Sequence, residues 1–174
     1  MNLADIRFPR QLEADDAAEA IRQTLLARTV KLRPGSNFVV PLLEMSEPLK
    51  IALRKARLNR RIRVGSEAIL EKLENERRGI ANVRAHATAA YGNRISRLLL
   101  FSSDGAERFY RHIEQALQEN APRLLGCLVN IDSMSLGRLI TGKDSMIKII
   151  MAEHKEAVSE ILRSLLVHPA APFE

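Results

Sequence analysis

Apolar residues in this sequence follow two patterns, which alternate along the C-terminal half of the chain. Short unbroken runs, such as LLLF at 98–101, have the length of buried strands, whereas the segments between them repeat apolar residues at helical spacing. Helices that alternate with strands indicate an α/β fold, because each helix must bury its apolar stripe on the sheet. We therefore predict a three-layer α-β-α sandwich with a small mixed sheet, preceded by an N-terminal helical and hairpin extension.

The expected C-terminal elements are bounded by polar and glycine positions. Ser103 and Asp104 end the first strand, and either side chain is able to cap the helix that follows. Gly142 separates a short helix from the last strand. The predicted order is strand 94–104, helix 106–118, strand 124–131, short helix 132–140, strand 144–151 and closing helix 155–166.

The first 47 residues are expected to form an extension rather than a second full domain. Their periodicity predicts an amphipathic helix followed by two short strands, and Pro41 and Pro48 bracket the link that follows. We assign residues 48–174 to the main domain. The predicted elements of the extension are helix 15–28, strand 29–32 and strand 38–40.

A basic helix opens the main domain. The pattern predicts a helix over 47–58 with one apolar face, then a short strand at 61–64, and then Gly65, which allows a tight turn. Ser66 is able to cap the next helix. The polar stretch beyond that helix predicts a loop-like insertion near 75–94.

Composition and charge narrow the class of protein. The chain has 174 residues, a net charge of +6 and a pI near 9.9, which favours a polyanionic partner where the charge is clustered. Cys127 is the single cysteine, so no disulfide forms within the chain and no cysteine zinc site can be assembled. The longest apolar runs are too short to cross a bilayer and no signal-peptide core is present, so we expect a soluble intracellular protein without membrane contact.

Positive charge is concentrated just before Gly65. Seven Lys or Arg residues and no acidic residue lie between Lys50 and Arg63, and such a cluster gains affinity by neutralising phosphates and releasing counterions. A solvated helix face is the plainer interpretation of the same residues. The glycine favours binding, because a turn there exposes the backbone N–H groups of Ser66 and Glu67 at a helix start, where they attract phosphate oxygens.

The order of these features resembles the ribosomal protein 7Ae superfamily over about residues 49–167. The resemblance is carried by KARLNRRIRVGSEAILEKLE, by the strands RLLLFSSD and LLGCLVNI, and by the segment SMSLGRLITGKDSMIKII. The superfamily includes kink-turn RNA binders, ribosomal protein 30e and a subunit of nuclear ribonuclease P. The resemblance implies the same α/β sandwich and a role in binding structured RNA.

Kink-turn binders of that superfamily read RNA with an asparagine and a glutamate two and three positions after the glycine, and with a lysine farther along the helix. This chain has Glu67, Ala68 and Glu71 at those positions, so the resemblance implies contact through the backbone and the basic helix rather than standard kink-turn recognition. A second family contact covers a flipped base, and Met134 holds the corresponding place. The RNA-binding residues that we predict are Lys55, Arg57, Arg60, Arg61, Arg63, Gly65, Ser66, Glu67, Met134 and Arg138.

These expectations combine into a non-catalytic component of a ribosome or of another stable ribonucleoprotein particle. Its expected partners are structured RNA, ribosomal or another stable non-coding RNA, and the other proteins of the particle. The four histidines are scattered and neither GxSxG nor a phosphate-loop pattern occurs, so we expect no enzyme activity, metal or cofactor. Two alternatives are a ribonuclease P-type particle subunit and a protein-interaction module that keeps the fold without kink-turn recognition.

Overall fold

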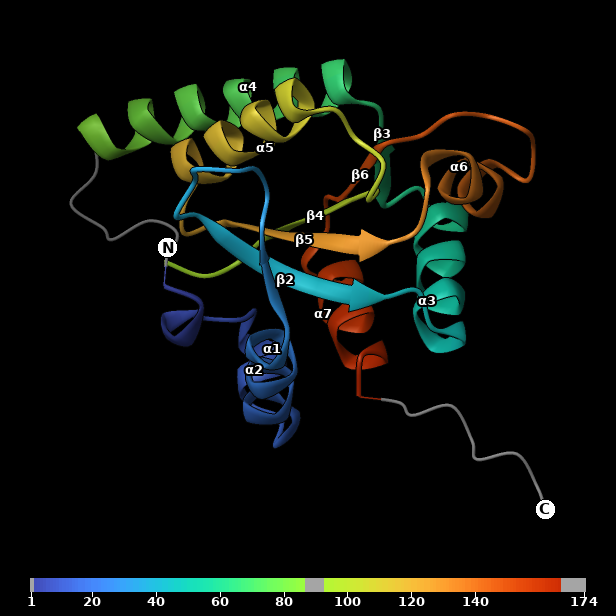
Figure 1. The fold of residues 1–174 in the computed structure, drawn as a ribbon. Helices are drawn as coiled ribbons and strands as arrows, with labels where there is room; N and C mark the ends of the chain where they lie inside the picture. The colour runs from blue at the N-terminus through green and yellow to red at the C-terminus, as the bar shows by residue number, and fades with distance from the viewer. Residues whose placement is uncertain (1, 87–92, 167–174) are drawn as a thin grey trace.

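Six strands form one mixed sheet through the middle of the molecule (Figure 1). The computed structural model describes residues 2–86 and 93–166. The strands are β1 (Thr29–Lys31), β2 (Val39–Glu44), β3 (Ile62–Val64), β4 (Arg97–Phe101), β5 (Leu124–Asn130) and β6 (Ile149–Ala152). Their order is β1-β2-β5-β4-β6-β3, in which β2, β5 and β4 are parallel neighbours and the other pairings are antiparallel.

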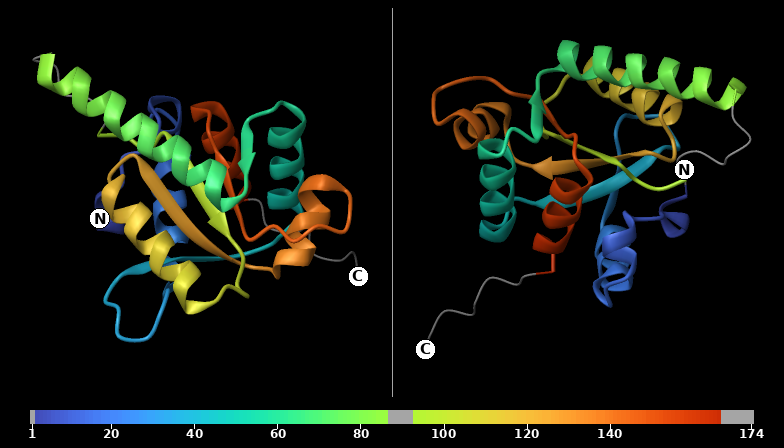
Figure 2. Two further views of the ribbon diagram at one scale, coloured as in Figure 1. Left: turned by 90° about the horizontal axis from the view of Figure 1, so that it is seen from above. Right: turned by 180° about the vertical axis from the view of Figure 1, so that it is seen from behind.

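Helices cover both faces of the sheet, so the predicted three-layer α/β architecture is confirmed. The helices are η1 (Leu3–Asp5), α1 (Arg10–Glu13), α2 (Ala17–Ala27), α3 (Glu47–Leu58), α4 (Ser66–His86), α5 (Glu107–Glu119), α6 (Ser133–Thr141) and α7 (Lys155–Ser164). Helices α4 and α5 lie on one face, and α1, α2, α3 and α7 lie on the other (Figure 2). In the part of the chain that the structure describes, no helix combines the length and apolar character needed to cross a bilayer.

Side chains of the central strands point alternately into two apolar clusters. In β4, Leu98 and Leu100 join the cluster that contains residues of α2, α3 and α7, whereas Leu99 and Phe101 join the cluster that contains residues of α4 and α5. Both faces are therefore buried, which is why these strands are continuous apolar runs in the sequence. Cys127 of β5 lies in the first cluster, and burial raises the pKa of its thiol, which stays protonated at neutral pH.

The N-terminal segment contributes to this sheet. The predicted strand pair is confirmed as β1 and β2, and β2 also pairs in parallel with β5, with Leu42 opposite Leu128. The sequence places Pro41 in a link, but Pro41 lies within β2. Proline is tolerated there because the pairing with β5 begins only at Leu42, so its missing N–H leaves no gap in that ladder.

A buried carboxylate fixes the turn between β1 and β2. Glu114 of α5 is 7% exposed and accepts hydrogen bonds from Ser36 Oγ at 2.8 Å and from Arg33 Nε at 3.1 Å. The Ser36 hydroxyl oxygen in turn accepts from the N–H of Phe38. A buried carboxylate with these partners is satisfied, and it ties the N-terminal hairpin to α5.

Helix α4 continues through most of the segment that the sequence predicts to be a loop. The prediction of a loop from residue 75 is therefore wrong as far as the end of α4. Glu74 accepts from Arg77 at 2.6 Å and from Arg78 at 2.9 Å, and such pairs support an exposed helix without apolar burial. Apolar periodicity does not detect a helix of this kind. Residues 87–92 of the predicted insertion lie outside the described residues.

Asp104 joins the end of β4 to α6 instead of capping α5. Ala106 holds the N-cap position of α5 without a side-chain hydrogen bond. The Asp104 carboxylate instead accepts from the N–H of Ser133 at 3.0 Å and from its hydroxyl at 2.7 Å. Burial alone would raise the pKa of Asp104, but the hydrogen bonds from Ser133 outweigh it and hold the pKa below its ordinary value.

This contact predicts a pH-dependent loss of stability in an Asp104→Ala variant. Because the folded-state pKa is lowered, the contribution is present above the unfolded value of about 3.9 and is lost as the pH falls through the folded value. We expect the variant to be less stable by about 1 kcal/mol at pH 7, with the difference shrinking well below pH 3.

Urea denaturation at pH 7, and again at about pH 2, measures the difference in unfolding free energy between the variant and the wild-type protein. Asp5→Ala is the matched control, because no hydrogen bond involves the Asp5 carboxylate in the part of the chain that the structure describes. An Asp104→Ala deficit of the same size at both pH values contradicts the assignment.

Candidate nucleic-acid interface

Three segments that are far apart in the sequence meet at one surface. They are the end of α3 with the turn that follows it, the Gly65 turn between β3 and α4, and the loop 142–148 after α6. Two adjoining hollows join these segments and share Thr141, and their volumes are about 810 and 410 Å³. We call this region the Gly65 surface; its lining includes Arg57, Leu58, Arg60, Gly65, Ser66, Thr141, Lys143, Met146 and Lys148.

The end of α3 has an arginine in a position that glycine usually occupies. The N–H of Arg61 donates to the carbonyl of Ala56 at 2.9 Å, and the N–H of Arg60 donates to the carbonyl of Arg57 at 3.0 Å. These two bonds form a Schellman motif, in which the residue just past the end of the helix, here Arg60, adopts the left-handed conformation. Arg60 has a φ of 56° there, which costs an L-residue about 1 kcal/mol relative to glycine. The strained backbone keeps an exposed guanidinium at the rim of the Gly65 surface.

The Gly65 turn presents a helix start, as the sequence predicts. Gly65 has a φ of 93°, its N–H donates to the carbonyl of Ile149 at 3.2 Å, and its own carbonyl accepts from Ile69 at 3.1 Å. Ser66 is therefore the first residue of α4 and not its cap. Within residues 2–86 and 93–166 no protein group accepts from the N–H of Ser66 or of Glu67, so both donors are available to an anion at the positive end of α4.

Several of the predicted basic residues form ion pairs instead of lining the surface. Lys55 binds Glu160 at 3.1 Å, Arg61 binds Glu156 at 2.9 Å, and Arg63 binds Glu153. These acids lie on α7 or just before it, so the three cations hold α3 and β3 against the C-terminal part of the fold. Four cationic side chains of the Gly65 surface have no acidic partner within residues 2–86 and 93–166, namely Arg57, Arg60, Lys143 and Lys148.

Met134 and Arg138 lie on α6, outside the lining of the two hollows. Met134 is partly buried, and Arg138 is paired with Asp144. The exposed apolar side chains are instead Leu58, 83% exposed, and Met146, 64% exposed. Nothing in the apolar pattern separates these two from ordinary core positions, and their placement at one surface becomes visible only when the loop 142–148 is seen beside α3.

Gly137 sets the position of that loop. A Cβ atom on Gly137 would lie 1.5 Å from the carbonyl oxygen of Ser145, so only glycine admits the loop backbone at this distance. The N–H of Ile147 also donates to the carbonyl of Ser133 at 3.0 Å. Gly137, within the segment SMSLGRLITGKDSMIKII, therefore has a packing role, which places Lys143, Met146 and Lys148 at the Gly65 surface.

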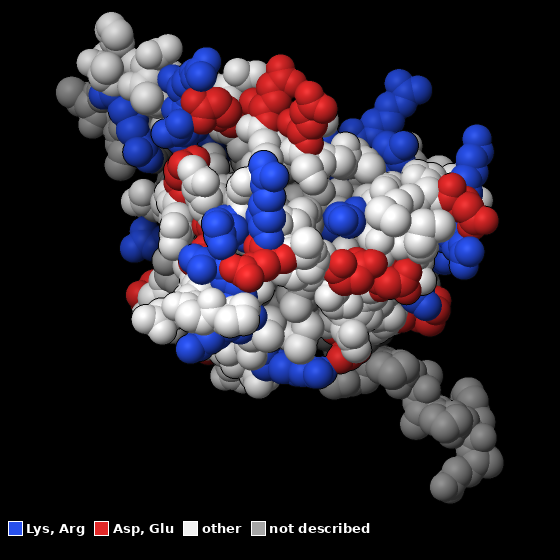
Figure 3. Space-filling model, turned by 45° about the horizontal axis from the view of Figure 1, so that its top comes forward, with Lys and Arg blue, Asp and Glu red and all other residues white. Residues whose placement is uncertain are grey.

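Charge is mixed over the molecule as a whole. Figure 3 shows Lys and Arg interspersed with Asp and Glu on the face that it presents, with no single field of one sign. Acidic residues also lie close to the Gly65 surface, since Glu67 is exposed in the first turn of α4 and Asp144 is exposed in the loop. Any anion must therefore be bound by local groups, because the total charge of +6 is spread widely.

No cluster of three or more His, Cys, Asp or Glu side chains suited to a metal ion occurs among the described residues.

No protein-family model and no curated protein matches this chain. Among solved structures, the chain is similar to a protein of unknown function from Bacillus halodurans C, with 14% sequence identity and a TM-score of 0.48, over 68% of this chain and 96% of that chain.

Proposed function

We propose that the protein is a non-catalytic RNA-binding protein and a structural component of a stable ribonucleoprotein particle, either a ribosome or another such particle. It contacts structured RNA through the end of α3, the Gly65 turn and the loop 142–148. The observation that carries this proposal is the convergence on one surface of four cations, two exposed apolar side chains and two backbone N–H groups that have no acceptor among the described residues. Intracellular location in such a particle follows from the proposed partner.

The cations and amides suit the RNA backbone. Arg57, Arg60, Lys143 and Lys148 lie around the hollows, and each phosphate that such a group neutralises releases counterions. The N–H groups of Ser66 and Glu67 add directed donors for phosphate oxygens. These contacts recognise the shape and charge of RNA and not its sequence.

The exposed apolar side chains suit unpaired bases. Leu58 and Met146 are among the most exposed large apolar residues of the described chain, and both line the hollows beside cations. Proteins that recognise RNA loops and bulges cover splayed bases with side chains, whereas a regular duplex offers few accessible base surfaces. This combination favours a structured RNA with an internal loop or bulge.

The helix and strand order from α3 to α7 also supports the proposal, because the resemblance to the ribosomal protein 7Ae superfamily rests on that order. The residues that would read a kink-turn remain changed to Glu67, Ala68 and Glu71. The proposed contact is therefore shape- and phosphate-dominated. A ribonuclease P-type particle is one of the particles that this contact fits.

Purification of the native protein at low salt tests the proposal. We expect RNA to co-purify and to be lost on ribonuclease treatment, because phosphate contacts dominate the complex. A stoichiometric protein partner that survives ribonuclease, with no RNA above background before treatment, would support the protein-interaction module instead and would overturn the proposal.

Neutralising the Gly65 surface should weaken RNA binding. In a triple variant, Arg57→Gln, Lys143→Gln and Lys148→Gln, we expect at least about a ten-fold loss of affinity near 0.1 M salt, and a salt slope shallower by about 2. Filter binding to an RNA hairpin with an asymmetric internal loop measures both quantities.

The matched control removes the same charge elsewhere, through Arg7→Gln, Lys31→Gln and Arg108→Gln. These three side chains are exposed and make no ion pair within the described residues. If the control loses as much affinity as the triple variant, binding follows total charge and the Gly65 surface is not the interface.

Arg60→Gly separates stability from binding. Glycine adopts a φ of 56° without strain, so we expect the variant to be more stable by about 1 kcal/mol. The same change removes a cation from the surface, so affinity for the internal-loop hairpin should fall several-fold. Thermal or urea unfolding gives the first quantity and filter binding the second; a variant that gains stability and binds RNA unchanged shows that Arg60 does not contact the ligand.

A further inference from the structure

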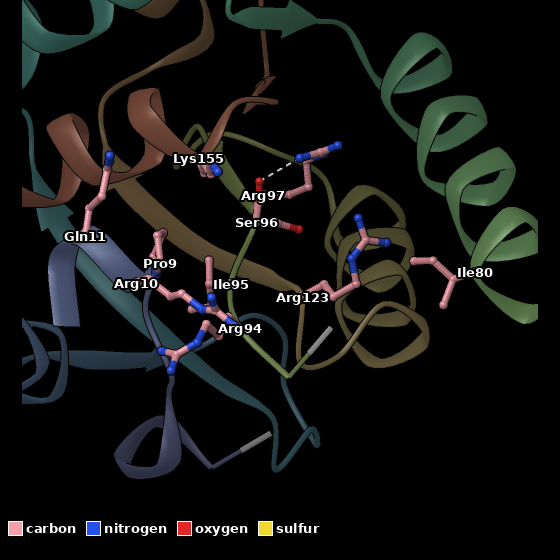
Figure 4. A pocket seen from close by; sticks show the side chains of 10 residues that line it. All are labelled: Pro9, Arg10, Gln11, Ile80, Arg94, Ile95, Ser96, Arg97, Arg123 and Lys155. Atoms are coloured by element: carbon pink, nitrogen blue, oxygen red, sulfur yellow. Dashed lines mark hydrogen bonds between the residues drawn. The ribbon is translucent and has the colours of Figure 1, made fainter. Parts of the chain in front are cut away.

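Another basic hollow lies at the other ends of the central strands and shares no lining residue with the Gly65 surface. It has a volume of about 530 Å³ and lies between α1, the residues that lead into β4 and β5, α4 and the start of α7 (Figure 4). Its lining consists of Pro9, Arg10, Gln11, Ile80, Arg94, Ile95, Ser96, Arg97, Arg123 and Lys155. A hollow of this size is within the range of small-molecule sites.

The hollow has more positive charge than its acidic neighbour can balance. The carboxylate of Glu76 contacts two arginines of the hollow: it accepts a hydrogen bond from Arg97 Nη2 at 2.8 Å and lies 3.4 Å from Arg123 Nη2. Burial would raise the pKa of Glu76, but the hydrogen bond and the charge of Arg97, together with Arg123, hold the pKa below its ordinary value. Glu76 is therefore ionised at neutral pH and offsets one of five cationic charges.

The other three cations have no carboxylate partner within residues 2–86 and 93–166. Arg94 donates to the backbone carbonyl of Phe8 at 3.0 Å, which is a neutral acceptor. Arg10 and Lys155 are exposed and form no ion pair in the same residues. An anion placed between these groups would meet positive charge from three different elements of the fold.

Ser96 adds an unsatisfied donor at the wall of the hollow. Its hydroxyl is buried and has no hydrogen-bond partner in the described part of the chain, although a buried hydroxyl without a partner is unfavourable. Figure 4 shows the Ser96 side chain between Arg97 and Arg123, directed toward the side of the hollow where Ile80 lies. An oxygen atom of a bound ligand would accept from this hydroxyl and satisfy it.

We propose that this hollow binds a phosphorylated small molecule of nucleotide size. The phosphates would be held by Arg10, Arg94 and Lys155, the Ser96 hydroxyl would donate to another oxygen of the same ligand, and the apolar side chains of Pro9, Ile80 and Ile95 would cover a ring. A small ligand is favoured over an RNA strand because the cations line a hollow between separate elements. This inference is independent of the proposed RNA contact at the Gly65 surface.

Calorimetric titration of the full chain, freed of RNA by ribonuclease and a high-salt wash, tests the site with three probes. ADP and inorganic pyrophosphate should each bind saturably at one site, and adenosine should bind at least about ten-fold more weakly, because it lacks the anion. Absence of saturable binding by both phosphate compounds would overturn the proposal.

Two variants locate the site. The double variant Arg10→Gln and Lys155→Gln should lower the affinity for ADP at least about ten-fold. The control pair Arg7→Gln and Arg108→Gln should leave that affinity unchanged. Ser96→Ala should lower the affinity for ADP several-fold without loss of thermal stability, because the hydroxyl that it removes has no hydrogen-bond partner in the described part of the chain. If the Arg10 and Lys155 double variant and its control lose the same affinity for ADP, ADP binding depends on overall charge and not on this hollow.

Competition distinguishes a small ligand from an RNA phosphate. The internal-loop hairpin should not displace ADP, and the Arg10→Gln and Lys155→Gln pair should keep its RNA affinity. If the hairpin displaces ADP in a one-to-one manner and the same pair loses RNA affinity, the hollow belongs to an RNA surface and the small-molecule assignment is wrong.

Discussion

The apolar side chains of β4 and β5 alternate between the two faces of the sheet, so both faces of these strands must be covered. The arrangement of the helices depends on this requirement. Leu98 and Leu99 point to opposite clusters, so a helix layer is needed on each face. The parallel pairing of these strands then sends each connection back over the sheet as a helix. The turns at one end of the strands are left to form the Gly65 surface, and those at the other end form the basic hollow beside Arg94.

The elements that bury an apolar face were predictable from the sequence, and those stabilised by polar contacts were not. Helix α4 beyond residue 74 is supported by pairs such as Glu74 with Arg77, which leave no apolar stripe to detect. Asp104 stands where a cap of α5 is expected, yet it binds Ser133 of another helix. A short polar side chain has several possible partners, and only the tertiary structure decides between them.

The candidate site shows the same division. Arg57, Arg60 and Gly65 are close in sequence, so a local pattern pointed to them. Lys143 and Met146 reach the same surface only through the folding of a distant loop, and no spacing rule connects them with α3. Of the basic cluster, Lys55, Arg61 and Arg63 are paired with acids from the last part of the chain, which shows that a charge run in sequence overstates the charge available in space.

The contact between Gly137 and the carbonyl of Ser145 is a contact between two backbones. The path of the loop 142–148 therefore depends on the absence of one side chain and on the buried side chain of Ile147, and not on exposed side chains such as Lys143 and Met146. Residues such as Lys143 and Met146 are free to be exchanged in evolution while the loop keeps its course. One glycine in this way allows the side chains displayed at this surface to change between descendants of the same fold without rebuilding its core.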